Sequence, residues 1–212
     1  MLLFPVEKVF LLSPARAKGV RAAMLSNPNA QFDLARRLQG GEAFPLGVVF
    51  TFLSGLYFRG KLAYARAFAK CKRGRCAIWV ITSNLGLVNV DERFTLKQLQ
   101  EFSEVDIDHE DPRYRAPLER DARRVRKQFP EAEVVLLGSI STKKYVDCLL
   151  EVFGAQLKFP IEFVGRGDMS RGGLLLRCAV DGQELTYVPV LGAERRGRRP
   201  AKLTPRRYTA GV

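Results

Sequence analysis

Four short apolar runs alternate along the chain with stretches whose apolar residues recur at helical spacing. The runs are KVFLL (8–12), GVVFTFL (47–53), AIWVIT (77–82) and VVLL (134–137). Short apolar runs that are rich in β-branched or aromatic residues and lack alternation are typical of strands covered on both faces. Such strands, separated by helices, predict an α/β fold with a mostly parallel sheet flanked by helices.

The clearest passage from a strand to a helix covers residues 134–154. The apolar run ends in Gly-Ser-x-Ser-Thr, where Ser141 or Thr142 can cap a helix with one apolar stripe that ends at Gly154. Free backbone N–H groups at such a helix start bind anions, phosphate in particular. The same pattern also fits an ordinary strand-to-helix turn with a good cap.

Capping residues predict where other helices begin. Asn27-Pro28 and Asp111-Pro112 each place an N-cap residue before a proline, which is favoured at the first helical position. Thr95 can cap a short helix over 95–102. An alanine-rich pattern over 62–70 predicts a further helix.

The C-terminal part of the chain predicts a β-hairpin. Two apolar stretches, 174–180 and 184–190, flank Asp181-Gly182, which is a typical turn sequence between two strands. A length of 212 residues suits one well-buried core and is short for two. We therefore expect a single α/β domain over residues 1–194 and a basic tail over 195–212.

Composition and hydropathy favour a globular protein without a membrane partner. Hydrophobic residues make up 47% of the chain and charged residues 27%. The apolar start, residues 1–6, is brief and has no basic segment before it. The longest apolar stretch, 44–58, is interrupted by glycine, serine and threonine and is shorter than a bilayer span. We expect a cytoplasmic protein.

The net charge of +13 is concentrated in two segments. Residues 43–90 and the residues after Glu194 contain no Asp or Glu, and each segment carries seven Lys or Arg. Such segregation is typical of a polyanion binder, although a solvated tail and a basic loop that aid solubility have the same composition. The candidate nucleic-acid-binding residues are Lys70, Lys72, Arg73, Arg75, Arg195, Arg196, Arg198, Arg199, Arg206 and Arg207.

The ends of the four apolar runs predict a cleft. The runs end at Ser13, Ser54, Ser83 and Ser139, and ligands of parallel sheets bind beyond the carboxyl ends of the strands. The polar, basic and aromatic residues that follow suit phosphate pairing and base stacking, whereas the spacing matches neither a Walker P-loop nor a Rossmann motif. The candidate nucleotide- or phosphate-binding residues are Ser13, Arg16, Tyr57, Arg59, Lys61, Asn84, Ser139, Ser141, Thr142 and Lys143.

A glycine-rich segment over 165–173 is the first place where we expect chemistry. It combines four glycines with Arg166, Asp168, Ser170 and Arg171. Glycines let backbone N–H groups approach a ligand closely, and the two arginines and the serine can bind phosphate. We expect a loop that covers the cleft, with Asp168 as the candidate catalytic acid or base.

The cysteines and the single histidine predict no metal site. Cys71 and Cys76 are separated by four residues and lack a second pair, and Cys148 and Cys178 are interpreted as core residues of a helix and a strand. His109 stands in an acidic stretch without a nucleophile nearby in the sequence. No cofactor is predicted.

Three short motifs resemble segments of the YaaA-like peroxide-stress proteins. LLSPAR (11–16) is similar to the Ser-Pro-Ala-Lys opening of that family, with Arg16 where the family has Lys. Residues 52–63, with a Gly-Leu-Tyr-x-x-Gly core, look like its glycine-tyrosine segment, and ITSNLGLVNVD (81–91) resembles its Ser-x-x-Gly-Leu-x-x-x-Asp stretch. The resemblance implies an α/β protein that binds DNA and assists survival of oxidative DNA damage, and it transfers no catalytic residue.

Three hypotheses of function follow. The first is a DNA-binding protein, with DNA favoured over RNA, whose cleft engages a nucleotide or an extruded base in the response to DNA damage or stress. The second is an enzyme that acts on a nucleotide or nucleobase, an N-glycosidase or a phosphate-ester hydrolase, with Asp168 in the catalytic role. The third is an RNA- or ribosome-associated factor in which the tail alone binds.

Overall fold

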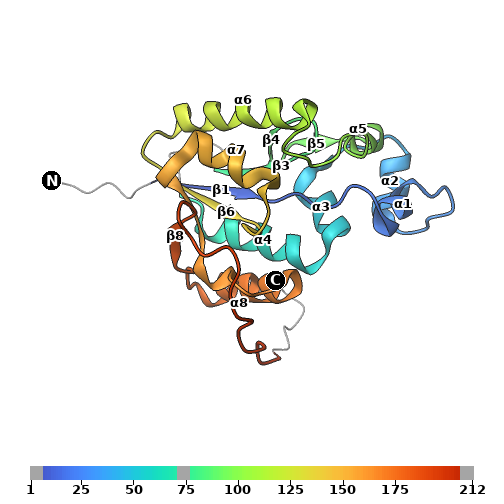
Figure 1. Cartoon of the computed structure of the whole chain (residues 1–212). Helices are drawn as coiled ribbons and strands as arrows, with labels where there is room; N and C mark the ends of the chain where they lie inside the picture. The colour runs from blue at the N-terminus through green and yellow to red at the C-terminus, as the bar shows by residue number, and fades with distance from the viewer. Residues whose placement is uncertain (1–6, 71–76, 206–212) are drawn as a thin grey trace.

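A six-stranded sheet of strand order β4-β3-β1-β6-β7-β8 lies at the centre of the protein (Figure 1). The computed structural model describes residues 7–70 and 77–205. Neighbouring inner strands pair in parallel and the two edge strands pair antiparallel, which confirms the predicted α/β fold with a mostly parallel sheet. The strands are β1 (Lys8–Leu12), β3 (Ile78–Ile81), β4 (Leu87–Asn89), β6 (Glu133–Leu137), β7 (Leu157–Pro160) and β8 (Tyr187–Pro189).

Helices cover both faces of the sheet. On one face α6 (Pro112–Gln128) and α7 (Lys143–Phe153) pack together, and on the other α4 (Leu56–Phe68) lies against the sheet with α8 (Asp168–Asp181) packed outside it (Figure 1). The remaining helices lie beyond the carboxyl end of β1 and are α1 (Val20–Ser26), α2 (Asp33–Gln39), α3 (Leu46–Ser54) and α5 (Leu96–Glu101). The small elements are a second sheet of β2 (Phe44–Pro45) and β5 (Arg93–Phe94) and the 3-10 turns η1 (Gly154–Gln156) and η2 (Ile161–Phe163).

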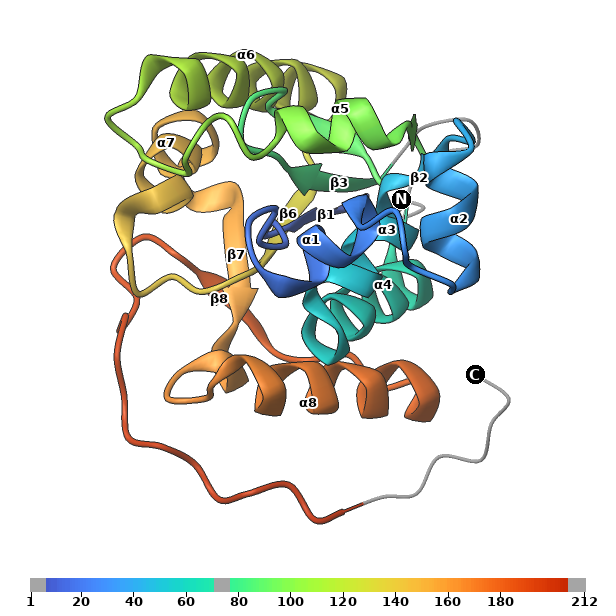
Figure 2. The ribbon, with the colours of Figure 1, turned by 90° about the vertical axis from the view of Figure 1, so that its right-hand side faces the viewer.

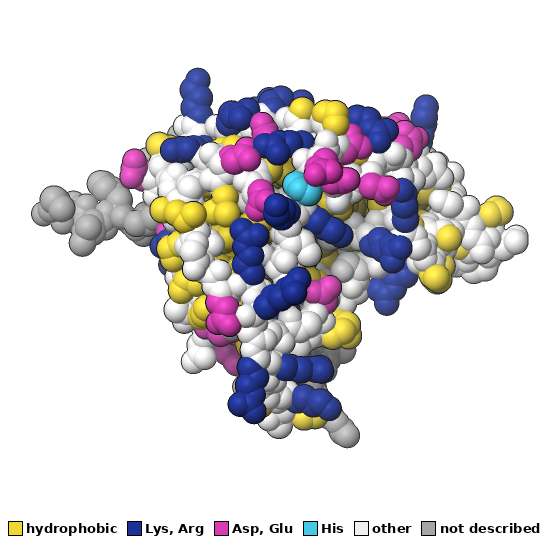
Figure 3. Space-filling model, viewed as in Figure 1, with side chains coloured by type: hydrophobic (Ala, Val, Ile, Leu, Met, Phe, Trp, Pro, Cys, Tyr) yellow, Lys and Arg dark blue, Asp and Glu magenta, His cyan; other side chains and the backbone are white. Residues whose placement is uncertain are grey.

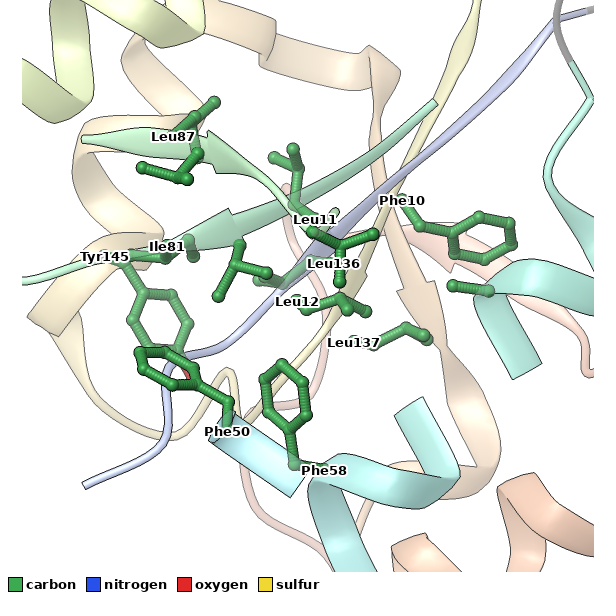
Figure 4. Packing of buried hydrophobic residues seen from close by; sticks show 14 of the residues in the cluster. Phe10, Leu11, Leu12, Phe50, Phe58, Ile81, Leu87, Leu136, Leu137 and Tyr145 are labelled. Atoms are coloured by element: carbon green, nitrogen blue, oxygen red, sulfur yellow. The ribbon is translucent and has the colours of Figure 1, made fainter. Parts of the chain in front are cut away.

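The core is built on β1 and β6. Every residue of β1 is buried, because helices cover both faces of this central strand. Leu11 pairs with Leu136 and Leu12 with Leu137 across the two strands. Phe50 and Phe58 meet edge to face 5.4 Å apart beside these leucines (Figure 4).

The predicted strand over 47–53 is wrong, because this segment forms helix α3. Val49 and Phe50 are buried on one side while Val48 is 43% exposed, which is the pattern of a helix that packs one face. Gly47 allows the close approach of α3 to the chain after β4, since a Cβ there would lie 2.7 Å from Val90 Cγ2. Tertiary packing therefore overrides the strand propensity of these residues.

The predicted glycine-rich loop and the strand over 174–180 are also wrong, because both fall largely within helix α8. Asp181-Gly182 ends that helix instead of turning a hairpin, with Gly182 in the left-handed conformation at φ 66°. The predicted C-terminal antiparallel pair exists, but it joins β7 to β8. Cys178 is accordingly a half-buried residue of α8 and not a strand residue.

Of the helix starts predicted at Asn27, Thr95 and Asp111, the last two are confirmed. The Asp111 carboxylate accepts a hydrogen bond from the backbone N–H of Arg113 at 2.9 Å, and Thr95 forms a capping box with Gln98. The start at Asn27-Pro28 is wrong, because the Asn27 side chain accepts from the Asn29 N–H in a turn and α2 begins only at Asp33.

The start and the end of α7 match the sequence in part. Thr142 is the N-cap residue of α7, but its side chain accepts no capping hydrogen bond. Gly154, at φ 54°, follows the last residue of the helix as predicted. The N–H groups of the first turn of α7 therefore have no side-chain cap.

The described part of the tail lies along the outer side of α8 (Figure 2). Arg166 donates to the carbonyl of Ala201 at 3.5 Å, and Arg177 donates to the carbonyl of Thr204. The backbone of Arg198 passes over Gly165, where a Cβ would lie 2.2 Å from the Arg198 carbonyl oxygen. These contacts use tail backbone carbonyls, so they do not require the basic side chains of the tail.

Within the described residues, no helix combines the length and the apolar character that a membrane crossing requires.

Candidate functional site

A cleft of about 710 Å³ opens at the carboxyl ends of β1, β3 and β6. From β1 the chain continues to β3 on one side, whereas from β6 it continues to β7 on the other, so the cleft lies at the switch point of the sheet. Its walls come from the segments after these strands, from α3 and α4, from residues 102–107, and from the first turns of α7 and α8. Clefts of this volume accommodate a ligand of nucleotide size.

The structure brings most of the predicted strand-end residues to this cleft. Lys61 lies directly behind Ser13, and Ser54 arrives from the end of α3 instead of from a strand. Asp168 contributes the first residue of α8, and its side chain is 68% exposed. The predicted residues that line the cleft are Ser13, Arg16, Ser54, Tyr57, Ser83, Ser139, Thr142 and Asp168.

Other predicted phosphate ligands lie outside the cleft wall. Arg59 and Lys143 are exposed on their helices, and the Asn84 amide donates to the Glu101 carbonyl at 3.2 Å. The Ser141 hydroxyl lies 2.7 Å from that of Ser139 and so contacts the wall from behind.

The two arginines of the glycine-rich segment hold the turn before α8. Arg166 donates to the Glu162 carbonyl at 3.0 Å and to the Ser170 hydroxyl at 3.2 Å, and Arg171 donates to the Phe163 carbonyl at 3.0 and 3.2 Å. Each guanidinium therefore already spends some of its five N–H donors on the turn, and the binding of phosphate by these two arginines stays a prediction.

Several cleft residues were not predicted. Lys18, Asp106, Lys144 and Tyr145 line the cleft, as do the aromatic side chains of α3 and of the chain after α5. Lys144 takes the place predicted for Lys143, because successive helical residues point about 100° apart and the sequence does not fix which one faces the cleft.

The rim of the cleft carries a net positive charge. Lys18 and Asp106 form an ion pair at 2.7 Å, and Asp168 lies 3.6 Å from Arg171. Arg16 and Lys144 are exposed and make no ion pair with any described residue. An anionic ligand can neutralise these two cations without breaking an existing pair.

Lys61 is a fully buried lysine behind the cleft. Its Nζ donates to the Ser13 carbonyl at 2.5 Å, lies 2.9 Å from Ser13 Oγ, and stands over the rings of Tyr57 and Phe58 at 4.5 and 4.8 Å. Burial lowers the pKa of Lys61 to about 7, because the charged form loses its hydration. The Asp168 carboxylate opposes this shift in pKa and the Arg171 guanidinium adds to it.

Two tyrosine hydroxyls complete the inner wall. The Tyr57 hydroxyl is buried, and burial raises the pKa of Tyr57, a rise that the nearby Arg171 guanidinium opposes. Tyr145 donates to the Ser139 carbonyl at 2.9 Å, and burial raises the pKa of Tyr145 to about 12, a rise that the nearby Ser13 hydroxyl opposes. A Cβ at Gly138 would lie 2.8 Å from both Ser13 Cβ and the Tyr145 hydroxyl, so glycine permits this convergence.

The described basic residues of 43–90 do not form one surface. Lys61 is buried, Arg66 pairs with Asp91 at 2.7 Å, and Lys70 bridges to Lys8 at the amino end of β1, opposite the cleft. The predicted Lys72, Arg73, Arg75, Arg206 and Arg207 lie outside the described residues.

The described tail retains an exposed basic surface. Arg195 lies 3.6 Å from Asp147, whereas Arg196, Arg198 and Arg199 are exposed and make no ion pair within the described chain. Lysine and arginine side chains occupy the lower part of the molecule, where α8 and the tail lie (Figure 3).

The cysteines and the histidine do not join the cleft. Cys148 is buried in α7, and burial raises the pKa of its thiol to about 12. His109 is half-buried beside Asp108 at 3.4 Å. Among the described residues, no three His, Cys, Asp or Glu side chains gather as metal ligands. The predicted pair Cys71 and Cys76 lies outside the described residues.

Comparison of the chain with family models, with curated proteins and with solved structures finds no match.

Proposed function

We propose that the protein binds nucleic acid, DNA in preference to RNA, and that the cleft receives a nucleotide or an extruded base of the bound strand. The observation that carries this proposal is the combination, in one cleft of about 710 Å³, of an aromatic floor with the unpaired cations Arg16 and Lys144 at the rim. A nucleotide offers both matching parts, because its base has apolar faces and its phosphate is an anion.

The floor of the cleft suits a flat, apolar ligand. Phe50, Tyr57, Phe102 and Tyr145 line it from four different segments and are themselves almost fully buried, so the ligand meets the small exposed parts of fixed rings. Contact of a base with aromatic side chains contributes roughly 1–3 kcal/mol and tolerates any base. The floor therefore supports binding without strong sequence preference.

The tail supplies a second, longer-range attraction. Its exposed arginines lie on a segment whose backbone is held against α8, so these cations stay on one surface of the protein. Cations that neutralise phosphates release condensed counterions, and this release favours association with duplex DNA. The resemblance to YaaA-like proteins agrees with a role in the response to DNA damage, which we include in the proposal.

An enzyme that acts on a nucleotide or nucleobase is the second candidate. The observation that favours it is the contact of the buried Lys61 amine with the Ser13 hydroxyl at the cleft wall. Asp168, the acid or base predicted from the sequence, lines the same cleft. If Asp168→Asn leaves every detected turnover intact, Asp168 has no catalytic role.

We expect the affinity for a short fluorescent DNA duplex to fall steeply with salt between about 50 and 200 mM, because each phosphate contact contributes roughly 0.9 to the logarithmic salt slope. A variant with glutamine at Arg196, Arg198, Arg199 and Lys202 keeps the backbone contacts of the tail. Its salt slope should be smaller in magnitude by about 2 to 4. Fluorescence anisotropy at several salt concentrations measures both slopes.

Three results of this titration would contradict parts of the proposal. Binding that is undetectable or independent of salt would remove the nucleic-acid function. Complete loss of affinity in the glutamine variant would favour the hypothesis in which the tail alone binds. Tighter binding to an RNA of the same sequence would reverse the preference for DNA.

The cleft itself is tested with a duplex that carries one mismatched pair. A mismatched base costs less to extrude, so we expect the wild type to bind the mismatched duplex about tenfold more tightly than the matched one. The double variant Arg16→Gln, Lys144→Gln should lose this preference. Lys127→Gln removes an exposed cation near the end of α6, away from the cleft, and should keep it. If the double variant keeps the wild-type preference for the mismatched duplex, the cleft takes no part in binding it.

A further inference from the structure

Ser13 separates the cleft from a buried amine. Ser13 lines the cleft and is 6% exposed, whereas Lys61 lies behind it with no exposed surface. Both hydrogen-bond partners of Lys61 Nζ among the described residues are atoms of Ser13, the carbonyl at 2.5 Å and the hydroxyl at 2.9 Å. A serine hydroxyl at a ligand site with a buried amine at hydrogen-bond distance is the arrangement of a nucleophile and its base.

The surroundings of Lys61 favour a neutral amine. A buried ammonium is stable when a carboxylate pairs with it, and no described carboxylate lies within 4 Å of Lys61. The charged groups that face it, Asp168 and Arg171 of α8, lie close to each other at 3.6 Å. Two further titratable groups lie at this site, Tyr57 on α4, whose ring is under Lys61 Nζ, and Tyr145 on α7, whose hydroxyl is beside Ser13, and the pKa of each is raised. None of these groups supplies a paired negative charge near neutral pH.

We propose that Ser13 is a nucleophile, with Lys61 as the base that takes its proton, and that the pair acts on a phosphate ester of the nucleotide or nucleic acid held in the cleft. The substrate class rests on the proposed function, because the exposed cations Arg16 and Lys144 stand at the same cleft and can hold the phosphate. The assignment of Ser13 as nucleophile and Lys61 as base does not depend on the proposed function, because it rests only on the geometry of these two residues.

The reaction is a displacement at phosphorus in two halves. In the first, Ser13 Oγ bonds to phosphorus while its proton passes to Lys61 Nζ, and the bond from phosphorus to the leaving oxygen breaks as that oxygen takes the proton from the ammonium. In the second, water bonds to phosphorus, its proton passes to Nζ and on to Ser13 Oγ, and the Oγ–phosphorus bond breaks. The sum is hydrolysis of one phosphate ester, without oxidation or reduction.

A structural lysine is the alternative explanation of the same contacts. In that case the Lys61 ammonium would hold the end of β1 through the Ser13 carbonyl, and the hydroxyl would have the low reactivity of an ordinary serine. The two explanations differ in whether Ser13 reacts with an electrophile, and in how that reaction depends on pH.

The wild-type protein tests this directly with a fluorophosphonate probe. Ser13 Oγ would bond to phosphorus, fluoride would leave, and the Ser13 proton would pass through Lys61 to solvent. We expect peptide mapping by mass spectrometry to place the adduct on Ser13. Ser139 is the internal comparison, because it lines the same cleft but has the Ser141 hydroxyl as its neighbour, and we expect no adduct there. No adduct on Ser13 would overturn the proposal.

Variants separate a base from a structural cation. Ser13→Ala should abolish labelling, and both Lys61→Met and Lys61→Arg should slow it at least about 100-fold, since arginine keeps the charge but does not give up its proton. Ser103 lies outside the cleft, so the Ser103→Ala variant should be labelled at the wild-type rate. Circular dichroism verifies that each variant is folded. If the Lys61→Arg variant is labelled at the wild-type rate, the role of Lys61 is that of a structural cation and the proposal is overturned.

The pH profile of wild-type labelling is a second test that requires no variant. Because burial lowers the pKa of Lys61 to about 7, labelling should rise about tenfold for each pH unit below 7 and level off above it. A rate that does not change between about pH 5.5 and 8.5 would overturn the role of Lys61.

DNA affinity measured on the same samples separates this proposal from the proposed function. Labelling of Ser13 without DNA affinity would support the nucleophile and overturn a nucleic-acid phosphate ester as its substrate. DNA affinity without labelling would overturn the nucleophile and leave the binding function in place.

Discussion

Replacing Gly172 by alanine is expected to lower the free energy of unfolding by about 2–3 kcal/mol. Gly172 lies where α8 crosses α4, and a Cβ there would lie 2.7 Å from the Leu56 carbonyl oxygen and 2.8 Å from Tyr57 Cα. Gly60 faces it, with its own missing Cβ only 2.5 Å from the Gly172 carbonyl oxygen. Backbone atoms of two packed helices cannot give way as a flexible side chain does, so the helices must separate.

The neighbouring glycine is the matched control. A Cβ at Gly173 would meet only Leu203 Cδ1, at an ordinary contact distance of 3.6 Å. Alanine in a helix interior is more stable than glycine by about 0.5–1 kcal/mol, so Gly173→Ala should be neutral or stabilising. Urea unfolding followed by circular dichroism measures both variants. Equal midpoints for Gly172→Ala and Gly173→Ala would contradict the close helix contact.

The contact between α4 and α8 also places the inner wall of the cleft. α4 carries Tyr57 and Lys61, and α8 begins with Asp168 and carries Arg171 one turn later. A wider crossing would move the two charged residues of α8 away from the buried amine. Gly172, interpreted from the sequence as part of a ligand-contacting segment, therefore acts on the site by allowing two helices to approach.

The sequence predicts those parts of the fold in which local chemistry and tertiary packing agree. β1, β3 and β6 are apolar without alternation because helices cover both faces of the inner sheet. The helix starts at Thr95 and Asp111 are predictable because one side chain makes the capping bond within a few residues of its own position.

The sequence fails where distant contacts decide between two structures that local preference allows. Residues 47–53 have the composition of a strand, and only their packing of Val49 and Phe50 toward the core makes them a helix. Gly172-Gly173 reads as a flexible loop because glycine is a poor helix former, yet α8 contains both. These glycines are favourable there because Gly172 lets α8 contact α4, which lies more than a hundred residues earlier in the chain.

The same division holds for the cleft. Ser13, Ser83 and Ser139 could be placed together because parallel strands end at one edge of the sheet. The burial of Lys61 could not be predicted, since the periodicity of α4 does not reveal that the Ser13 carbonyl lies within reach of its amine. A lysine among aromatic residues is more often an exposed residue, and only the packed structure distinguishes the two cases.

Lys61→Met is expected to remove a pH dependence of stability that the wild type shows between pH 7 and 8.5. The folded-state pKa of Lys61, about 7, lies below its ordinary value of 10.5 in the unfolded chain. Between these values the unfolded chain binds more protons, so raising the pH favours the folded state. The wild type should therefore gain about 1–2 kcal/mol in free energy of unfolding from pH 7 to 8.5 relative to Lys61→Met. Urea unfolding at several pH values measures this difference.

The comparison stops at pH 8.5 because other buried groups change stability at higher pH. Burial raises the pKa of the Cys148 thiol and of the buried tyrosines, so these groups lower stability once the pH rises above their ordinary values of 9.0 and 10.0. Lys127→Met makes the same chemical change at an exposed position of α6 and should keep the wild-type dependence. An identical dependence in wild type and Lys61→Met would show that Lys61 is charged in the folded protein throughout this range, and an ammonium at that position cannot accept the proton of Ser13.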